Sequence, residues 1–275
     1  MNLRFSKMHG LGNDFVVVDC RAHAFDLNAA QVARVGDRHF GVGFDQLLTI
    51  EPARDSACAF RYGIYNADGS AALQCGNGVR CVAAWLRRAG ALGAGAVQLE
   101  SPSGPVSVEL ADDGRMRVDM GVPRFAPEQI PLRMPASDIY WLQINDIDIE
   151  FGAVSMGNPH AVVEITDVAT APLATLGQAL STDAAFPQGC NVGFAQIVNR
   201  AHLRLRVWER GAGATLACGS GACAAVAVLR RRGKLDGDVA VQLPGGRLDI
   251  HWDGADAPVW MSGPAEFVFE GEIQL

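Results

Sequence analysis

Two cysteines stand in the same local sequence, each where a glycine-rich turn leads into an apolar segment. Cys75 begins a Cys-Gly-Asn-Gly run, and Cys218 begins a Cys-Gly-Ser-Gly run 143 residues later. At the start of a helix, unpaired backbone N–H groups and the positive end of the helix dipole favour a thiolate and lower the pKa of a thiol. The same N–H groups bind anions such as a carboxylate. The pattern therefore predicts two reactive thiols, each beside an anion-binding turn.

Two thiols on opposite sides of one carbon atom suit a proton transfer that inverts configuration. One thiolate removes the α-proton of a bound amino acid, and the opposite thiol returns a proton to the other face. Two helix N-termini would stabilise the enediolate charge, so this chemistry needs no cofactor and no metal. No Cys-x-x-Cys pair is present, which argues against structural zinc. Lys7 and Lys234 are the only lysines, so a Schiff-base enzyme has few candidates.

Packing in a hydrophobic core is the alternative role for each cysteine, because cysteine is among the most buried residue types. The duplicated glycine context favours a functional pair in Cys75 and Cys218. The other cysteines are predicted to be small packing residues: Cys20, Cys58, Cys81, Cys190 and Cys223.

The cysteine runs belong to a longer internal repeat. Gly12-Asn13 and Gly157-Asn158 each precede a pair of valines, and Asn66 and Glu209 each stand nine residues before their cysteine. The run Val-Gly-Phe-x-Gln occurs at 42–46 and again at 192–196. Because these matches keep the same order, we expect two copies of one unit related by a pseudo-two-fold axis.

The elements that position the cysteines are mostly strands. Alternating apolar residues between Gly, Asp and Pro turns predict several short strands in each copy. One helix per copy is predicted, over Gly76 to Ala89 and over Gly219 to Arg232, each followed by a C-terminal glycine. A helix that is apolar nearly all round must be covered on all sides. We therefore expect an α+β fold of two pseudo-symmetric domains, each a β-barrel-like sheet wrapped around a central apolar helix.

Composition limits the class of partner. The chain has 275 residues, 49% hydrophobic residues and a net charge of −7, which is typical of a globular protein with two domains. It lacks the basic surface of a nucleic-acid-binding or membrane-binding protein, so we expect a small-molecule partner. The N-terminus has no secretory signal pattern, which predicts a cytoplasmic protein with reduced thiols.

At these residues the sequence resembles the diaminopimelate epimerase family over essentially the whole chain. The segments that carry the resemblance are Met8 to Phe15, Asn66 to Ser70, Cys75 to Cys81, Gly157 to His160, Glu209 to Gly213 and Ala217 to Gly221.

The resemblance implies a diaminopimelate epimerase-like fold and interconversion of LL- and meso-diaminopimelate without pyridoxal phosphate, in lysine and peptidoglycan biosynthesis. It implies that Cys75 and Cys218 are the acid and base, and that His160 and Glu209 tune them. The implied substrate-binding residues are Asn13, Gln46, Asn66, Gly76, Asn77, Asn158, Asn191, Glu209, Arg210, Gly219 and Ser220.

The resemblance also implies a cytoplasmic homodimer in which Phe269 lies at the contact between subunits. The expected first domain covers residues 1–119, with the last strand, 264–275, returning to it. The expected second domain covers residues 120–263.

Two other functions remain open at this point. A proline racemase-like isomerase would use the same cysteine pair, although its monocarboxylic ring substrate would not need Glu209, Arg210 and the asparagines. A thiol-disulfide switch or anion-binding module would use Cys75 and Cys218 without turnover. Incorporation of solvent deuterium into a substrate would separate an enzyme from a binding protein.

Overall fold

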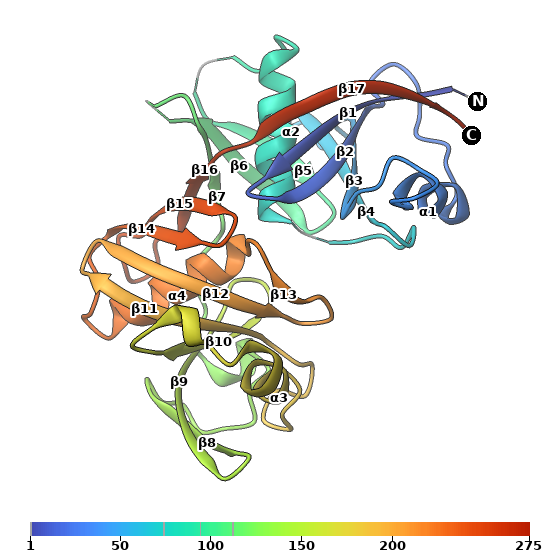
Figure 1. Ribbon diagram of the computed structural model, residues 1–275. Helices are drawn as coiled ribbons and strands as arrows, with labels where there is room; N and C mark the ends of the chain where they lie inside the picture. Colours follow the sequence, from blue (N-terminus) through green and yellow to red (C-terminus); the bar gives the residue numbers. More distant parts are fainter. Residues whose placement is uncertain (1, 74, 94, 112) are drawn as a thin grey trace. The chain divides into compact units, whose positions relative to one another are not determined.

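The computed structural model describes residues 2–73, 75–93, 95–111 and 113–275, and the chain forms two compact units (Figure 1). The first unit comprises Met1–Val118 and Ser262–Leu275, and the second comprises Asp119–Met261. Met1, with which the expected first domain begins, lies outside the described residues. Both units are mixed α+β and dominated by strands, so the predicted fold class is confirmed.

In the first unit, the strand at the C-terminus lies beside the strand at the N-terminus. The elements are β1 (Asn2–Gly10), β2 (Asn13–Asp19), α1 (Ala29–Gly36), β3 (Gln46–Pro52), β4 (Phe60–Asn66), α2 (Gly76–Arg88), β5 (Val97–Ser101), β6 (Gly104–Leu110), β7 (Met116–Asp119) and β17 (Glu266–Gln274). β17 pairs antiparallel with β1, from Asn2 opposite Gln274 to His9 opposite Glu266 (Figure 1).

The second unit has its own strands and one long helix. Its elements are η1 (Pro127–Gln129), β8 (Tyr140–Ile144), β9 (Ile147–Ser155), β10 (Pro159–Glu164), η2 (Val168–Thr170), η3 (Leu173–Gly177), α3 (Gln178–Ser181), β11 (Asn191–Asn199), β12 (His202–Glu209), β13 (Gly213–Thr215), α4 (Gly219–Arg231), β14 (Asp238–Leu243) and β15 (Gly246–His251). Along β16 (Trp260–Gly263) the chain passes back to the first unit.

The two units repeat one order of strand pairing. In the first, β1–β2 is antiparallel, β2–β3 parallel, β3–β4 antiparallel, β4–β5 parallel and β5–β6 antiparallel. In the second, β9–β10, β10–β11, β11–β12, β12–β14 and β14–β15 alternate in the same way. In each unit the long helix lies in the connection between the two strands of the second parallel pair. The sequence repeat is therefore a repeat of topology.

The two long helices are central to their units, as predicted. α2 packs against β1, β2 and β3, and α4 packs against β9, β10, β11, β12 and β15. Each helix ends one residue earlier than predicted, and Gly90 (φ +67°) and Gly233 (φ +73°) follow in the left-handed conformation that glycine adopts most easily. α2 differs from the expected apolar helix because two of its buried residues, Asn77 and Arg80, are polar.

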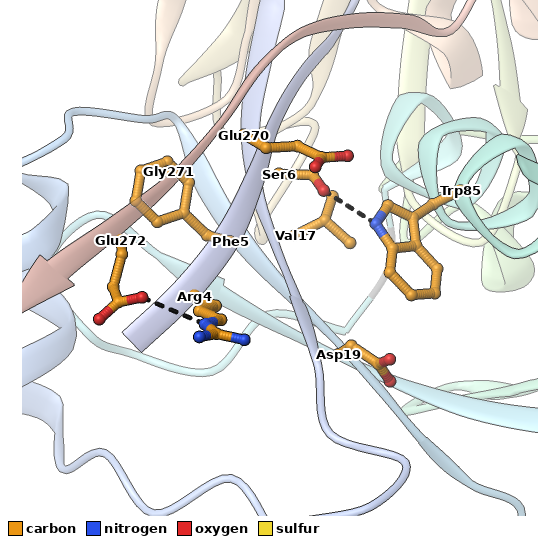
Figure 2. Close-up of a pocket in the computed structure, with 9 residues that line it drawn as sticks. All are labelled: Arg4, Phe5, Ser6, Val17, Asp19, Trp85, Glu270, Gly271 and Glu272. Atoms are coloured by element: carbon orange, nitrogen blue, oxygen red, sulfur yellow. Dashed lines mark hydrogen bonds and ion pairs between the residues drawn. The ribbon is translucent and has the colours of Figure 1, made fainter. Parts of the chain in front are cut away.

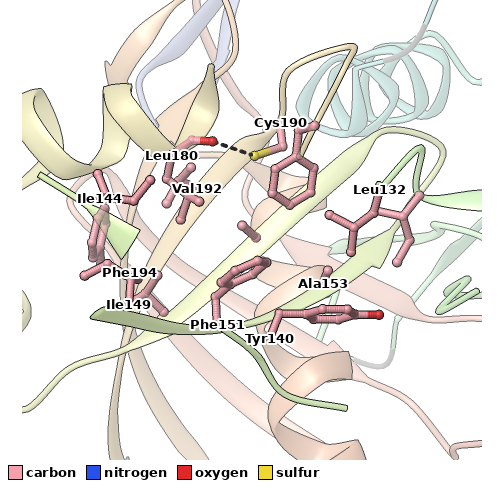
Figure 3. Packing of buried hydrophobic residues seen from close by; sticks show 14 of the residues in the cluster. Leu132, Tyr140, Ile144, Ile149, Phe151, Ala153, Leu180, Cys190, Val192 and Phe194 are labelled. Carbon is pink, nitrogen blue, oxygen red and sulfur yellow. Dashed lines mark hydrogen bonds between the residues drawn. The ribbon is translucent and has the colours of Figure 1, made fainter. Parts of the chain in front are cut away.

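Each unit has its own hydrophobic core. In the second unit, Phe151 is fully buried and stacks on Tyr140, with ring centroids 5.5 Å apart. Both residues belong to a cluster of buried apolar side chains, most of which come from the strands (Figure 3). In the first unit, Val16 and Leu47 belong to a cluster of buried apolar side chains that also includes Val32 and Val35 of α1. α1 and α3 were not predicted from the sequence, because helices of eight and four residues show no clear period. None of the helices in the described part of the chain is long and apolar enough to cross a bilayer.

Candidate active site

Three of the predicted binding residues of the first unit lie at one edge of its sheet. Asn13 is the first residue of β2, and Gln46 is the first residue of β3. Because β2 and β3 are parallel, both begin at the same edge. Asn66 ends the antiparallel strand β4 directly opposite Gln46, and Gln46 Nε2 donates to Asn66 Oδ1 at 3.0 Å. Gln46 Oε1 is buried and has no hydrogen-bond partner among the described residues.

Cys75 lies at the start of α2 and contacts this group of amides. It is the N-cap residue, and its Sγ accepts a hydrogen bond from the backbone N–H of Gly78 at 3.4 Å. The thiol donates to Asn13 Oδ1 at 3.6 Å, and Asn77 Nδ2 donates to the same oxygen at 3.3 Å. The structure therefore brings Cys75, Asn13 and Asn77 together, with Gly76 as the first helical residue after the cysteine.

The second unit repeats this arrangement. Asn191 begins β11, His160 lies opposite it on the parallel strand β10, and Glu209 ends the antiparallel strand β12. Asn191 Oδ1 accepts from the backbone N–H of Arg210 at 3.0 Å. His160 Nε2 lies 2.9 Å from Asn158 Oδ1. These five predicted residues therefore lie along one sheet edge.

Cys218 caps α4 but occupies a different environment from Cys75. It is 5% exposed, and burial raises the pKa of its thiol well above its ordinary value. The nearby carboxylate of Glu209 raises this pKa further, whereas the Ser220 hydroxyl, 3.7 Å from Sγ, and the Gly221 N–H oppose the rise without reversing it. The predicted lowering of the pKa by the helix start is therefore wrong for Cys218, because desolvation outweighs the helix terminus. Gly219 is the buried first residue of α4.

His160 is neutral near physiological pH. It is 1% exposed, and burial together with a smaller effect of the positive charge of Arg210 lowers its pKa to about 3. Arg210 is itself exposed, and its Nη1 donates to the carbonyl oxygen of Gln188 at 2.8 Å. A Cβ on Gly189 (φ +67°) would come within 3.1 Å of Arg210 Cδ, so this glycine leaves room for the arginine side chain.

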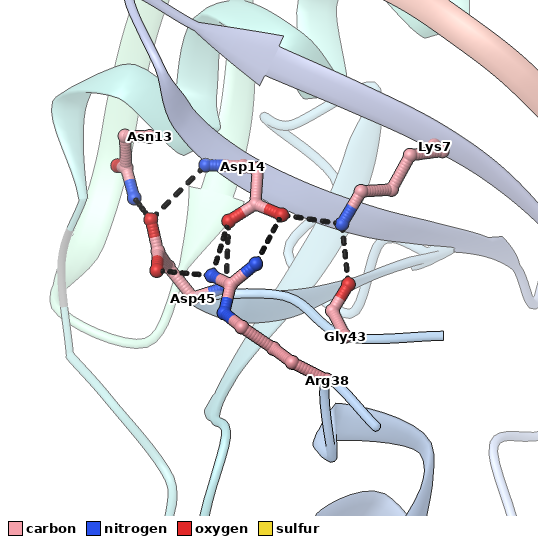
Figure 4. A network of polar contacts seen from close by, with 6 residues as sticks. All are labelled: Lys7, Asn13, Asp14, Arg38, Gly43 and Asp45. Carbon is pink, nitrogen blue, oxygen red and sulfur yellow. Dashed lines mark hydrogen bonds and ion pairs between the residues drawn. The ribbon is translucent and has the colours of Figure 1, made fainter. Parts of the chain in front are cut away.

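An ion-pair network beside Asn13 was not predicted from the sequence (Figure 4). Arg38 donates to both carboxylate oxygens of Asp14, at 2.7 and 3.1 Å, and to Asp45 at 2.7 Å. The buried Lys7 ammonium also pairs with Asp14. Burial would raise the pKa of Asp14, but the hydrogen bonds from Arg38 and Lys7 outweigh it and lower the pKa to about 2. These residues come from two separate segments, 7–14 and 38–45, and no spacing pattern marks them.

Phe269 lies on β17, away from the strand ends that hold Asn13, Gln46 and Asn66. It is 49% exposed, and its ring meets that of Phe5 edge-on with centroids 5.9 Å apart. The structure of the single chain does not test its predicted place at a subunit contact.

A cavity of about 470 Å³ lies in the first unit but contains none of the predicted site residues (Figure 2). Its lining comes from β1, β2, β17 and Trp85 of α2, whose Nε1 donates to Ser6 Oγ at 3.0 Å. Within the described residues, no group of three or more His, Cys, Asp or Glu side chains could hold a metal ion.

The sequence matches a known family over most of its length. The diaminopimelate epimerase family model matches residues 5–126 and 152–268. The diaminopimelate epimerase of Xanthomonas axonopodis pv. citri is 56% identical over 98% of this chain and 96% of its own length. That of Alkalilimnicola ehrlichii is 52% identical over the full length of both chains.

Solved structures at low identity share the fold. A phenazine biosynthesis protein of the PhzF family from Bacillus anthracis superposes with a TM-score of 0.68 at 15% identity, covering 100% of both chains. A hydroxyproline epimerase from Agrobacterium vitis, solved with bound trans-4-hydroxy-L-proline, gives a TM-score of 0.68 at 15% identity, over 99% of this chain and 92% of its own.

Proposed function

The chain belongs to the diaminopimelate epimerase family, and from this membership we propose that it interconverts LL- and meso-2,6-diaminopimelate by proton transfer at one α-carbon. The observation that carries the proposal is 56% identity to a named diaminopimelate epimerase over 98% of the chain. The reaction serves lysine and peptidoglycan biosynthesis, and we place it in the cytoplasm.

Cys75 and Cys218 are the acid and base of this reaction. One Sγ, as thiolate, takes the α-proton, and the electron pair of the C–H bond passes into the carboxylate to form an enediolate. The other Sγ–H then protonates the α-carbon from the opposite face. One thiol and one thiolate have exchanged protonation states at the end of the turnover, so no oxidant, reductant or cofactor is consumed. The duplicated N-cap position of the two cysteines supports this assignment.

The amides and the Glu209–Arg210 pair bind the two ends of the substrate. The buried Gln46 Oε1, which lacks a partner among the described residues, is an acceptor suited to an ammonium group. The exposed guanidinium of Arg210 suits the carboxylate at the distal end of diaminopimelate. Asn66, Asn158 and Asn191 complete the binding set, with the helix starts at Gly76-Asn77 and Gly219-Ser220 donating backbone N–H groups to the reacting carboxylate.

The test is an activity assay on the purified chain and two single variants. Wild-type protein should convert LL- to meso-diaminopimelate, read by chiral chromatography, without added pyridoxal phosphate. Cys75→Ala and Cys218→Ala should each lose roughly 10²–10⁴-fold in kcat, since each removes one proton-transfer group. Near-wild-type turnover in either variant would contradict the two-base assignment. Racemisation of proline in place of diaminopimelate would favour the proline racemase alternative, and no turnover of either would favour a thiol switch.

We further propose that the protein is a homodimer with β17 at the contact. Val268 and Phe269 on this strand are 55% and 49% exposed, an uncommon position for neighbouring large apolar side chains. Phe269→Glu should halve the mass seen by sedimentation equilibrium, whereas Phe40→Glu, at an 88% exposed phenylalanine on a loop, should leave it unchanged. A wild-type monomer would overturn this part of the proposal.

A further inference from the structure

Four side chains of the first unit form one directional chain of hydrogen bonds. Arg80 Nη2 donates to Asn77 Oδ1 at 2.9 Å, and Asn77 Nδ2 donates to Asn13 Oδ1 at 3.3 Å. Asn13 Nδ2 then donates to Asp45 Oδ2 at 2.8 Å. A guanidinium only donates and a carboxylate only accepts, so the two ends determine which way both amides face.

The direction of this chain decides what Asn13 presents to Cys75. With its amide nitrogen held by Asp45, Asn13 turns its carbonyl oxygen toward Sγ, at 3.6 Å. An oxygen there accepts the thiol hydrogen, whereas an inverted amide would point an N–H group at sulfur and favour the thiolate. The orientation of one amide therefore influences where the proton of Cys75 resides.

Both ends of the chain are held firmly. Asp45 accepts from Arg38 at 2.7 Å and from the backbone N–H of Asp14 at 3.1 Å (Figure 4). At the other end, Arg80 is fully buried. A Cβ on Gly10 would lie 3.1 Å from Arg80 Nη2 and 3.4 Å from Asn77 Cβ, so the adjacent hairpin leaves just enough room for this pair.

The second unit has no equivalent residues for this chain of hydrogen bonds. Gln46 and Asn191 begin the equivalent strands β3 and β11, so Asp45 matches Cys190. On the two long helices, Arg80 matches Cys223 and Asn77 matches Ser220. None of these three counterparts is a carboxylate or a guanidinium. The directional chain therefore belongs to Cys75 alone and distinguishes it from Cys218.

We propose that Asp45 and Arg80 are positioning residues that set the orientation of the Asn13 amide and thereby keep the proton on Cys75 in the substrate-free protein. The inference rests on the proposed function in that Cys75 is one of the two reacting thiols. Neither Asp45 nor Arg80 needs to touch the substrate in this role.

The test measures alkylation of Cys75 by iodoacetamide in the absence of substrate, followed by peptide mass spectrometry across a range of pH. Asparagine at position 45 can donate as well as accept, so Asp45→Asn frees the Asn13 amide to invert. Because the thiolate is the nucleophile, alkylation at pH 7 should become roughly two- to tenfold faster, the range expected from one hydrogen bond. The midpoint of the alkylation profile should move to lower pH.

Arg38→Gln is the matched control. It removes the ion pair with Asp45 but leaves the acceptor that holds Asn13, so the Cys75 profile should stay close to that of the wild type. An unchanged profile in Asp45→Asn, or an equal shift in both variants, overturns the inference. Thermal melting checks that both variants fold, which their exposed positions favour.

The outcome is separable from that of the proposed function, because no substrate is present. An active wild-type enzyme whose Cys75 alkylation ignores Asp45 overturns the positioning role only. A shifted profile in a protein that does not epimerise diaminopimelate overturns the proposed function and leaves the amide orientation standing.

Discussion

At the scale of single residues, the two cysteines occupy unlike surroundings although their sequences match. Cys75 is partly exposed and lies between a backbone donor on Gly78 and the carbonyl oxygen of Asn13. Cys218 is buried beside Glu209, which together with desolvation raises its pKa. The two thiols are therefore chemically distinct in the chain, which suits a reaction that uses them in opposite protonation states.

Replacing Arg210 should weaken substrate binding more than it slows the chemistry. Arg210→Met keeps an unbranched apolar stem but removes the guanidinium that would pair with the distal carboxylate, so KM for diaminopimelate should rise roughly ten- to hundredfold. Steady-state kinetics measure this change. Arg204→Met, at an exposed position on β12, the strand that ends just before Arg210, is the control and should leave KM near the wild-type value. An unchanged KM in Arg210→Met would exclude this residue from the binding site.

His160 should make the protein sensitive to acid. Its pKa is about 3 in the folded protein and near 6.5 in an unfolded chain. Between pH 6.5 and pH 3, therefore, His160 binds a proton in the unfolded state but not in the folded state. Stability is complete above pH 6.5 and falls toward pH 3, by about 2 kcal/mol at pH 5. His160→Gln can keep a donor to Asn158 and should remove this loss. Urea unfolding at pH 7 and pH 5 measures it, and parallel losses in both proteins would contradict the argument.

The sequence marks the proposed reacting and binding residues more clearly than it marks the residues that contact them. Cys75 and Asn13 stand out because the second copy repeats them as Cys218 and Asn158, and Asn66 stands out because Glu209 holds the same spacing to its cysteine. Asp45 and Arg80 have no such counterpart, and they meet Asn13 only through pairing of β2 with β3 and the close packing of α2. A contact that depends on tertiary packing produces no periodic pattern in the sequence, so these two residues could not be predicted as neighbours of Asn13.

At the scale of elements, the first turn of α4 is packed tightly against its cysteine. A Cβ on Gly221 would lie 3.2 Å from Cys218 Sγ and 3.2 Å from Val207 Cγ2. Glycine inside a helix costs up to about 1 kcal/mol relative to alanine. Its presence at this position follows from the room that the thiol needs.

Gly221→Ala should therefore displace the Cys218 thiol and lower kcat by roughly tenfold, since small misplacements of a reacting group are costly. The melting temperature should change little, because the gain in helix propensity offsets the local crowding. Gly93→Ala is the control, with nothing within 4 Å of the added Cβ. A variant with full kcat would show that the start of α4 does not position the thiol.

Elements with a strong pattern were the ones predicted from the sequence. Both units are rich in strands, as the alternating pattern indicates, and the two long helices α2 and α4 lie where they were predicted, each ending one residue earlier. α1 and α3 were missed because eight and four residues are too few to display a helical period. α1 is instead marked by a capping box between Asn28 and Gln31, a signal that was in the sequence.

At the scale of the whole molecule, the repeat accounts for the two proton-transfer groups that the proposed reaction needs. Each unit supplies a sheet edge with amide or carboxylate side chains and one cysteine at a helix start. One such unit offers a single acid or base, and inversion at a carbon atom requires one on each face. Duplication of the unit supplies the second group, and divergence at Asp45, Arg80 and Glu209 gives each thiol its own surroundings.

The central claim is that Cys75 and Cys218 act on opposite faces of one α-carbon, and proton exchange with solvent tests it most directly. LL-diaminopimelate is incubated with the enzyme in D₂O, and the first few per cent of reaction is analysed by mass spectrometry after separation of the isomers. Because the returning proton comes from a different thiol that exchanges with solvent, the meso product should carry one deuterium and the recovered LL substrate almost none. Equal deuterium in both isomers, or product without deuterium, would contradict the two-thiol account.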